Sequence, residues 1–216
     1  GIRDSSVTGV QTCALPIFID VYCGVEQDVL APVPEVKFDF VIGACHAVDA
    51  GGELVYADAS PEHLRAGVER HFGGDYYAFV RAYYETVAAI GRDFTPDFVA
   101  HFDLVTKYNE GGLFFDEDDP RYRAAAISAL IAVMERVRVF EINTGGMYRA
   151  GRSVPYPAPF ILREIRARGG EILLTSDSHD AASLGYRYDL AAELARSAGF
   201  RYAKVLTPRG FISVPL

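Results

Sequence analysis

The stretch GGEILLTSDSHD, residues 169–180, changes from an apolar run to a polar cluster within a few residues, and this restricts the folds open to the chain. An apolar run that follows Gly-Gly and ends in Ser and Asp is typical of a core strand in a parallel sheet. If the backbone stays extended, Asp177 and His179 leave it on the same face and point at one site. The alternative is that Asp177 caps the next helix and His179 packs in the interior. Whether Asp177 and His179 form a site or have these structural roles depends on whether other strand ends carry similar residues.

Four more apolar runs repeat the plan, each followed by side chains that can bind a metal or an anion. The expected strands and their polar residues are 18–26 with Glu26, 38–46 with His46, 98–104 with His101 and Asp103, and 137–142 with Asn143. On an extended strand His101 and Asp103 share a face, as a ligand and an acid that hydrogen-bonds to it. Arg149 lies in the loop beyond the last of these strands. There a guanidinium either holds an anionic group or remains a solvated loop residue.

Helical patterns separate the strands. Ser60 and Pro61 have the character of an N-cap and a first helical residue, and apolar side chains recur at helical spacing over 75–90. Another helix is expected to open at Asp119-Pro120, and the chain should end with helices over 160–168 and 189–198 and a strand over 202–206. Alternation of uniformly apolar strands with helices predicts an α/β fold, a TIM-like barrel whose chemistry lies at the carboxyl ends of its strands.

Length and charge exclude several classes of protein. The 216 residues suit one large domain or a piece of one, and no apolar run reaches the length of a membrane span. A formal charge of −8 disfavours a non-specific nucleic-acid binder or a protein of anionic membrane surfaces. The three cysteines, Cys13, Cys23 and Cys45, show no metal-finger spacing, which favours a reducing compartment and a cytoplasmic location.

Residues 1–17 stand apart from the rest of the chain. They have no initiator Met, no basic segment and no periodic pattern, and they resemble the translation of a sequencing adapter joined to the end of a gene. We therefore expect a non-native extension over 1–17 and a single domain over 18–216.

The candidate ligands form a set of imidazoles and carboxylates: Glu26, His46, His101, Asp177 and His179. Such a set suits Zn²⁺, Mn²⁺ or Fe²⁺ and is too rich in nitrogen for calcium. Two such ions can generate hydroxide near neutral pH and neutralise phosphate oxygens, which is the chemistry of phosphoester hydrolysis. His63 and His71 lack an acidic partner at a suitable spacing and are interpreted as surface or packing residues. No nucleophile elbow or phosphate-binding P-loop is present in the sequence.

The motifs, taken in order, resemble those of polymerase-and-histidinol-phosphatase (PHP) domain proteins, and most of all the histidinol-phosphatase branch. The similarity covers residues 18–216 and rests on GVEQD at 24–28, IGACH at 42–46, HFDL at 101–104, EINT at 141–144, PYP at 155–157 and SDSH at 176–179. The resemblance implies a distorted (β/α)7 barrel with a trinuclear Zn/Mn/Fe site. It also implies hydrolysis of a small phosphomonoester, L-histidinol phosphate, to L-histidinol and phosphate in histidine biosynthesis.

The resemblance also implies a role for each site residue. Glu26, His46 and His101 would hold one metal, Asp177 would join Glu26 on a second, and His179 would bind a third. Asp177 and His179 would thereby carry the catalytic chemistry. Arg149 would contact the substrate phosphate, while Asp103 and Asn143 would hydrogen-bond to the ligands.

One departure from the family pattern leaves alternatives open. The family begins with a strand bearing His-x-His, which is not found upstream of Glu26. We therefore expect a barrel that lacks one or two N-terminal strands, with one complete and two incomplete metal positions. The alternatives are a PHP phosphoesterase that acts on another phosphomonoester or a nucleic-acid end, and a metal-binding fragment without activity.

Overall fold

A seven-stranded sheet organises the computed structural model, which describes residues 20–216. The expected extension over 1–17 lies outside the described residues. In sheet order the strands are β1 (Gly24–Asp28), β2 (Phe40–Ala44), β5 (Phe98–Val99), β6 (Val139–Asn143), β7 (Glu171–Thr175), β8 (Tyr202–Thr207) and β9 (Gly210–Pro215).

The strands from β1 to β8 are parallel, and β9 returns antiparallel to β8 through a hairpin. Glu26 pairs with Ile42 of β2, and Ile42 in turn pairs with Phe98 of β5. Parallel pairing brings the carboxyl ends of the strands to one edge of the sheet. The side chains that follow those ends therefore converge although they are far apart in the sequence.

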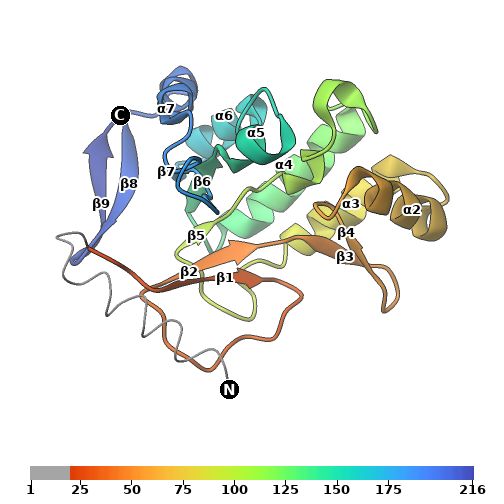
Figure 1. The fold of residues 1–216 in the computed structure, drawn as a ribbon, viewed down its shortest axis with the longest axis horizontal. Coiled ribbons are helices and arrows are strands. Elements are labelled where there is room, and N and C mark those ends of the chain that lie inside the picture. Colours follow the sequence, from red (N-terminus) through yellow and green to blue (C-terminus); the bar gives the residue numbers. More distant parts are fainter. Residues whose placement is uncertain (1–19) are drawn as a thin grey trace.

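The sheet is curved. Four strand spacings separate β5 from β9, which in a flat sheet would be roughly 19 Å. The rings of Phe98 in β5 and Phe211 in β9 nevertheless lie only 6.2 Å apart between centroids. Figure 1 shows the hairpin β8–β9 and the pair β1–β2 at the two ends of the curved sheet.

From β2 to β8 of the sheet, helices follow the strands in the expected alternation, whereas a loop without a helix joins β1 to β2 (Figure 1). The helices are α2 (Pro61–Phe72), α3 (Tyr76–Val87), α4 (Pro120–Met134), α5 (Gly145–Ala150), α6 (Pro159–Ala167) and α7 (Tyr188–Ser197), with short 3₁₀ turns at Leu104–Thr106 and Glu110–Gly112. Ser60, Asp75 and Asp119 cap α2, α3 and α4 by accepting hydrogen bonds from backbone N–H groups of the first turn. None of the helices within residues 20–216 combines the length and the apolar character that crossing a membrane would require.

Helix α4 packs on α3 and illustrates why the periodicity is informative. Its buried residues are Tyr122, Ala126, Ala129, Leu130, Val133 and Met134, which recur every three or four positions. The hydroxyl of Tyr84 in α3 donates to that of Tyr122 at 3.3 Å, inside the aromatic layer that covers the sheet.

Three local expectations differ from the structure. The strand expected over 18–26 begins only at Gly24 and runs on to Asp28. The strand expected over 98–104 ends at Val99, and the segment that follows leads through a turn into the first 3₁₀ helix, which begins at Leu104. A hairpin of β3 (Ala47–Asp49) and β4 (Leu54–Tyr56), and the final strand β9, had no counterpart in the sequence prediction. The α/β class with a mostly parallel sheet is confirmed.

Candidate metal centre

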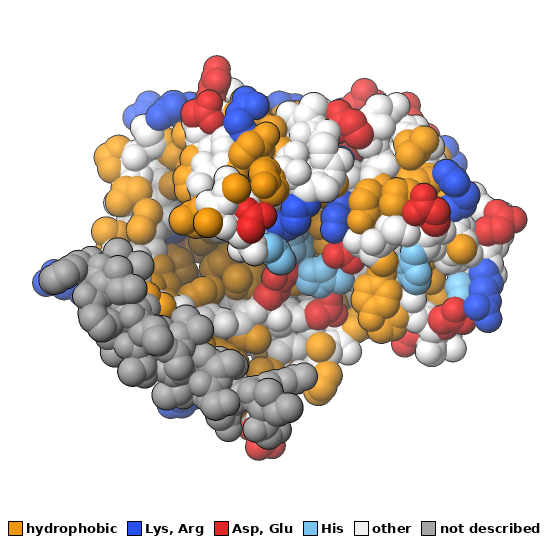
Figure 2. All heavy atoms as spheres, viewed as in Figure 1, with side chains coloured by type: hydrophobic (Ala, Val, Ile, Leu, Met, Phe, Trp, Pro, Cys, Tyr) orange, Lys and Arg blue, Asp and Glu red, His pale blue; other side chains and the backbone are white. Residues whose placement is uncertain are grey.

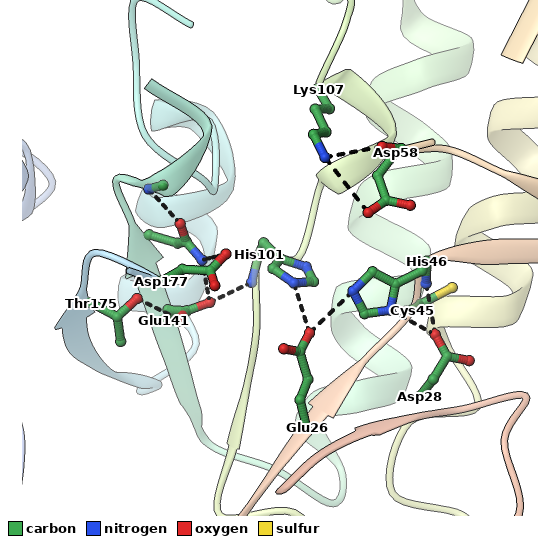
Figure 3. A network of polar contacts seen from close by, with 12 residues as sticks. Glu26, Asp28, Cys45, His46, Asp58, His101, Lys107, Glu141, Thr175 and Asp177 are labelled. Carbon is green, nitrogen blue, oxygen red and sulfur yellow. Dashed lines mark hydrogen bonds and ion pairs between the residues drawn. The ribbon is translucent and has the colours of Figure 1, made fainter. Parts of the chain in front are cut away.

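Side chains from within β1 and from just beyond the ends of β2 and β5 meet at one point (Figure 3). Oε1 of Glu26 in β1 lies 3.1 Å from Nε2 of His46, which follows β2, and 3.0 Å from Nε2 of His101, which follows β5. Candidate ligand atoms of the three residues all lie within 4.8 Å of one another. The structure therefore brings together three of the five predicted ligands.

This donor set fits a divalent transition metal. Two imidazole nitrogens and a carboxylate oxygen are the three protein ligands found in many catalytic zinc sites, where a fourth position stays open. A tetrahedral ion with bonds of about 2.1 Å holds its ligand atoms roughly 3.4 Å apart, close to the two spacings around Glu26. Little rearrangement would be needed to admit the ion.

Asp28 holds His46 in the orientation that a metal ligand needs. One oxygen of Asp28 lies 2.9 Å from both Nδ1 and the backbone N of His46. A ligating histidine usually donates its second ring N–H to such an acceptor, which fixes the tautomer and ring angle. Asp28 was not among the predicted site residues, although it stands two residues beyond Glu26 and shares its strand face.

The electrostatics of the cluster favour charged side chains. Burial by itself would raise the pKa of Glu26, but hydrogen bonds from His101 and His46 lower it well below its usual range. Burial would lower the pKa of His46, but Asp28 and Glu26 raise it to about 10. The pKa of His101 is also raised, because the partner Glu26 outweighs burial. A cation that bound here would displace the imidazole protons, as metal binding to histidine requires.

Replacing Asp28 with Asn should weaken metal binding roughly 10- to 100-fold, the usual cost of losing such an outer partner. The Asn side chain keeps the size of Asp28 but removes the charge that supports His46. Titration calorimetry with Mn²⁺ would measure the loss. The matched control is Asp97→Asn, since Asp97 accepts a hydrogen bond from Val41 N away from the cluster. Equal affinities in the two variants would mean that Asp28 does not support the ligand.

Asp177 and His179 line the same cleft but do not share a strand face, because β7 ends at Thr175. Asp177 has a φ of 45°, so the extended backbone on which that expectation depended does not persist. Its carboxylate accepts a hydrogen bond from Arg149, whose Nη1 also lies 3.0 Å from Nδ1 of His179. The ligand roles of Asp177 and His179 remain predictions.

Arg149 lies in the last turn of the short helix α5 rather than in a loop. Besides the Asp177 carboxylate it donates to the Asp177 carbonyl, and its side chain is 30% exposed. The guanidinium is thus held at the cleft by the loop after β7 and remains accessible from solvent.

The end of β6 supplies a buried polar network beside His101. Glu141 accepts hydrogen bonds from the backbone N of His101 at 2.8 Å and from Nδ2 of Asn143 at 3.0 Å. Asn143 also approaches the Asp177 carboxylate at 3.3 Å, as an outer partner of a ligand would. Burial raises the pKa of Glu141. Glu141 was not predicted as a site residue; its sequence signals are an acid inside an apolar strand and its place in the EINT motif.

Asp103 does not support His101 as expected. Since the strand ends at Val99, the two residues do not alternate on one extended segment. Asp103 is fully buried, and its carboxylate accepts from the backbone N of Ala158 at 2.8 Å. Among the described residues, Nδ1 of His101 has no hydrogen-bond partner.

The cluster opens into a cleft of about 120 Å³ that holds charges of both signs. Figure 2 shows histidine, acidic and basic side chains gathered at a hollow in the middle of this face. On the wall opposite the loop after β7, Nζ of Lys107 donates to the carbonyl of Asp58 at 3.0 Å and lies 3.6 Å from its carboxylate. His63 and His71 are not among the cleft residues, although His71 does have an acidic neighbour, since its Nε2 lies 3.5 Å from Oε2 of Glu53.

Comparison with known proteins identifies relatives of one kind. The chain is 32% identical over 182 residues to a protein of Deinococcus radiodurans named probable histidinol-phosphatase, covering 84% of this chain and 63% of the relative. A Schizosaccharomyces pombe protein of the same name is 23% identical over 197 residues, with 84% and 60% covered. The chain thus spans about 60% of the length of these curated relatives. No family model matches it.

A solved structure has the same fold. The crystal structure of a Listeria monocytogenes protein assigned as a histidinol phosphatase, hisK, superposes with a TM-score of 0.61 at 20% identity. The match covers 71% of this chain and 58% of the other. At that identity the likeness supports the mixed α/β architecture with its mostly parallel sheet.

Proposed function

We propose that the chain belongs to the histidinol-phosphatase family and carries the active site of a metal-dependent phosphomonoesterase that hydrolyses L-histidinol phosphate to L-histidinol and phosphate in histidine biosynthesis. The observation that carries the proposal is the convergence of Glu26, His46 and His101 on one point of a cleft that also contains Arg149. The substrate is a small phosphate ester, and the cleft combines metal ligands with cationic donors.

Glu26, His46 and His101 would hold one cation, and Asp177 and His179, on the same cleft, would hold further ones. When bound, Zn²⁺, Mn²⁺ or Fe²⁺ supplies Lewis-acid polarisation of the phosphoryl group and lowers the pKa of water. The curved sheet supports a further proposal, that residues 18–216 form one domain and part of a distorted (β/α)7 barrel of the PHP type.

The residues of the chain itself have separable tasks. Asp28 keeps Nε2 of His46 directed at the cluster, and Glu141 fixes the backbone at His101. Arg149 is positioned to bind and orient a phosphate dianion, because a guanidinium forms charge-assisted hydrogen bonds with phosphate oxygens. Within residues 20–216 the thiols of Cys23 and Cys45 are free, which supports the proposal of a cytoplasmic location.

Phosphate release from L-histidinol phosphate tests the function. The chain would be stripped with a chelator, assayed, and assayed again after addition of Mn²⁺, Zn²⁺ or Fe²⁺. We expect release that is lost on stripping and restored by metal. Release that persists in the stripped protein would refute metal dependence, and metal-restored release from other phosphomonoesters but not from this one would refute the substrate.

Replacing Arg149 with Ala should raise the Michaelis constant for L-histidinol phosphate by about 10- to 100-fold. This factor corresponds to the binding free energy that a hydrogen bond to a charged group contributes. Steady-state phosphate release measures the constant. Arg168→Ala is the control, because Arg168 pairs with Glu164 on the surface of α6 and does not line the cleft. If both variants keep the wild-type constant, Arg149 does not bind the phosphate.

A further inference from the structure

The hydroxyl of Tyr156 is a buried polar group without a hydrogen-bond partner among the described residues. Tyr156 is only 2% exposed, and buried tyrosine hydroxyls ordinarily find a partner. The comparable buried tyrosines follow that rule: the hydroxyl of Tyr83 donates to the carbonyl of Cys45 at 3.1 Å, and that of Tyr84 donates to Tyr122. Tyr156 departs from the pattern and also lines the cleft.

The position of the Tyr156 ring is fixed from several sides. Its backbone N donates to the carbonyl of Asn143 at 2.9 Å and its carbonyl accepts from Asn143 N at 2.8 Å. The guanidinium of Arg152 lies over the ring at 5.3 Å from the centroid, and the ring of His101 stands edge-on with centroids 6.4 Å apart. These contacts fix the position of the ring and therefore of the unpartnered hydroxyl at its end.

Gly146 leaves room at the hydroxyl end of the ring. A Cβ at Gly146 would lie 2.7 Å from the Tyr156 hydroxyl and 2.5 Å from Cε2, closer than real atoms pack. Gly146 itself lines the cleft, as do His101 and Arg149. Tyr156 thus forms part of the cleft wall, and its hydroxyl lies against Gly146 of the helix that carries Arg149.

We propose that the Tyr156 hydroxyl binds the substrate by donating a hydrogen bond to a phosphate oxygen. The assignment rests on the proposed phosphatase function and adds a neutral donor to the cationic Arg149. The group is suited to the task because burial raises the pKa of Tyr156, so the hydroxyl keeps its proton. A donor left unpaired in the free protein gains its partner only when phosphate is present.

The test is binding of inorganic phosphate, by titration calorimetry, to the Mn²⁺-loaded protein and to Tyr156→Phe. Phe keeps the ring and removes only the hydroxyl. We expect about 3- to 10-fold weaker phosphate binding, with no loss of melting temperature, since no protein hydrogen bond is broken. The control Tyr84→Phe removes a partnered hydroxyl outside the cleft and should lower the melting temperature without changing phosphate affinity.

Each outcome bears on a separate claim. Phosphate affinity in Tyr156→Phe equal to that of the wild type overturns the assignment of Tyr156 and leaves the phosphatase proposal standing. A lowered melting temperature with unchanged affinity does the same and makes the hydroxyl a structural group. If the wild-type protein loaded with Mn²⁺ binds no phosphate, the proposed function fails, and the role of Tyr156 fails with it.

Discussion

Replacement of Glu26 with Gln is expected to weaken binding of Mn²⁺ or Zn²⁺ by more than about 100-fold, because loss of an outer partner alone already costs roughly 10- to 100-fold. Oε1 of Glu26 is the atom on which His46 and His101 both converge. An amide has no charge to offer the cation, and its NH₂ group would face two nitrogens. Titration calorimetry measures the affinity, and phosphate release should fall with it.

The control for this change is Glu164→Gln, which removes a carboxylate from a surface ion pair with Arg168. Its metal affinity should equal that of the wild type. Circular dichroism should show both variants folded, since Glu26 and Glu164 lie outside the apolar core. A folded Glu26→Gln protein that binds metal as the wild type does would remove Glu26 from the metal centre.

Phe140→Ala should destabilise the protein by about 3–5 kcal/mol, the cost of deleting a large core side chain and leaving a cavity. Phe140 is completely buried in β6, and its ring lies 5.9 Å from that of Phe102. A typical domain is stable by only about 5–15 kcal/mol, so the variant should be partly unfolded at 37 °C. Urea unfolding followed by circular dichroism gives the difference.

Leu113→Ala provides the comparison. Leu113 is 60% exposed, so this substitution removes apolar atoms from the surface and not from the core. Its effect should stay within about 0.5 kcal/mol. A Phe140 variant that unfolds at the same urea concentration as the Leu113 variant would show that β6 does not form part of a packed core.

The helices could be predicted well because their signals are local. An N-cap such as Ser60 or Asp119 and the proline after it specify the start of a helix within a few residues. Helix α4 also shows that spacing identifies a buried face, since its six buried residues recur every three or four positions. The tertiary fold decides which residues this buried face of α4 contacts, whereas the position of the helix can be assigned from the sequence.

Strand ends could be located less well because they depend on distant partners. β5 stops at Val99, five residues before the 3₁₀ helix that begins at Leu104, and β1 continues past Glu26 because β2 pairs with it as far as Asp28. Asp177 has a left-handed backbone whose carbonyl accepts from Arg149, a contact between segments that no local pattern encodes.

The site residues show the same difference between local sequence signals and contacts with distant segments. Glu26, His46 and His101 could be grouped from the sequence because parallel strands bring their carboxyl ends to one edge of a sheet. Asp28 and Glu141 act through His46 and through the backbone of His101, so their roles appear only once those partners are placed. The role predicted for Asp103 was wrong because His101 and Asp103 were expected to share a face of one strand, and that strand ends at Val99.

The most direct measurement of the metal centre is an anomalous-difference map, recorded at the zinc edge, from a crystal of the protein soaked in Zn²⁺. We predict a peak roughly 2.0–2.2 Å from Oε1 of Glu26 and from Nε2 of His46 and His101. A map with no peak among these three side chains, or with zinc held only by Asp177 and His179, would contradict the proposed centre.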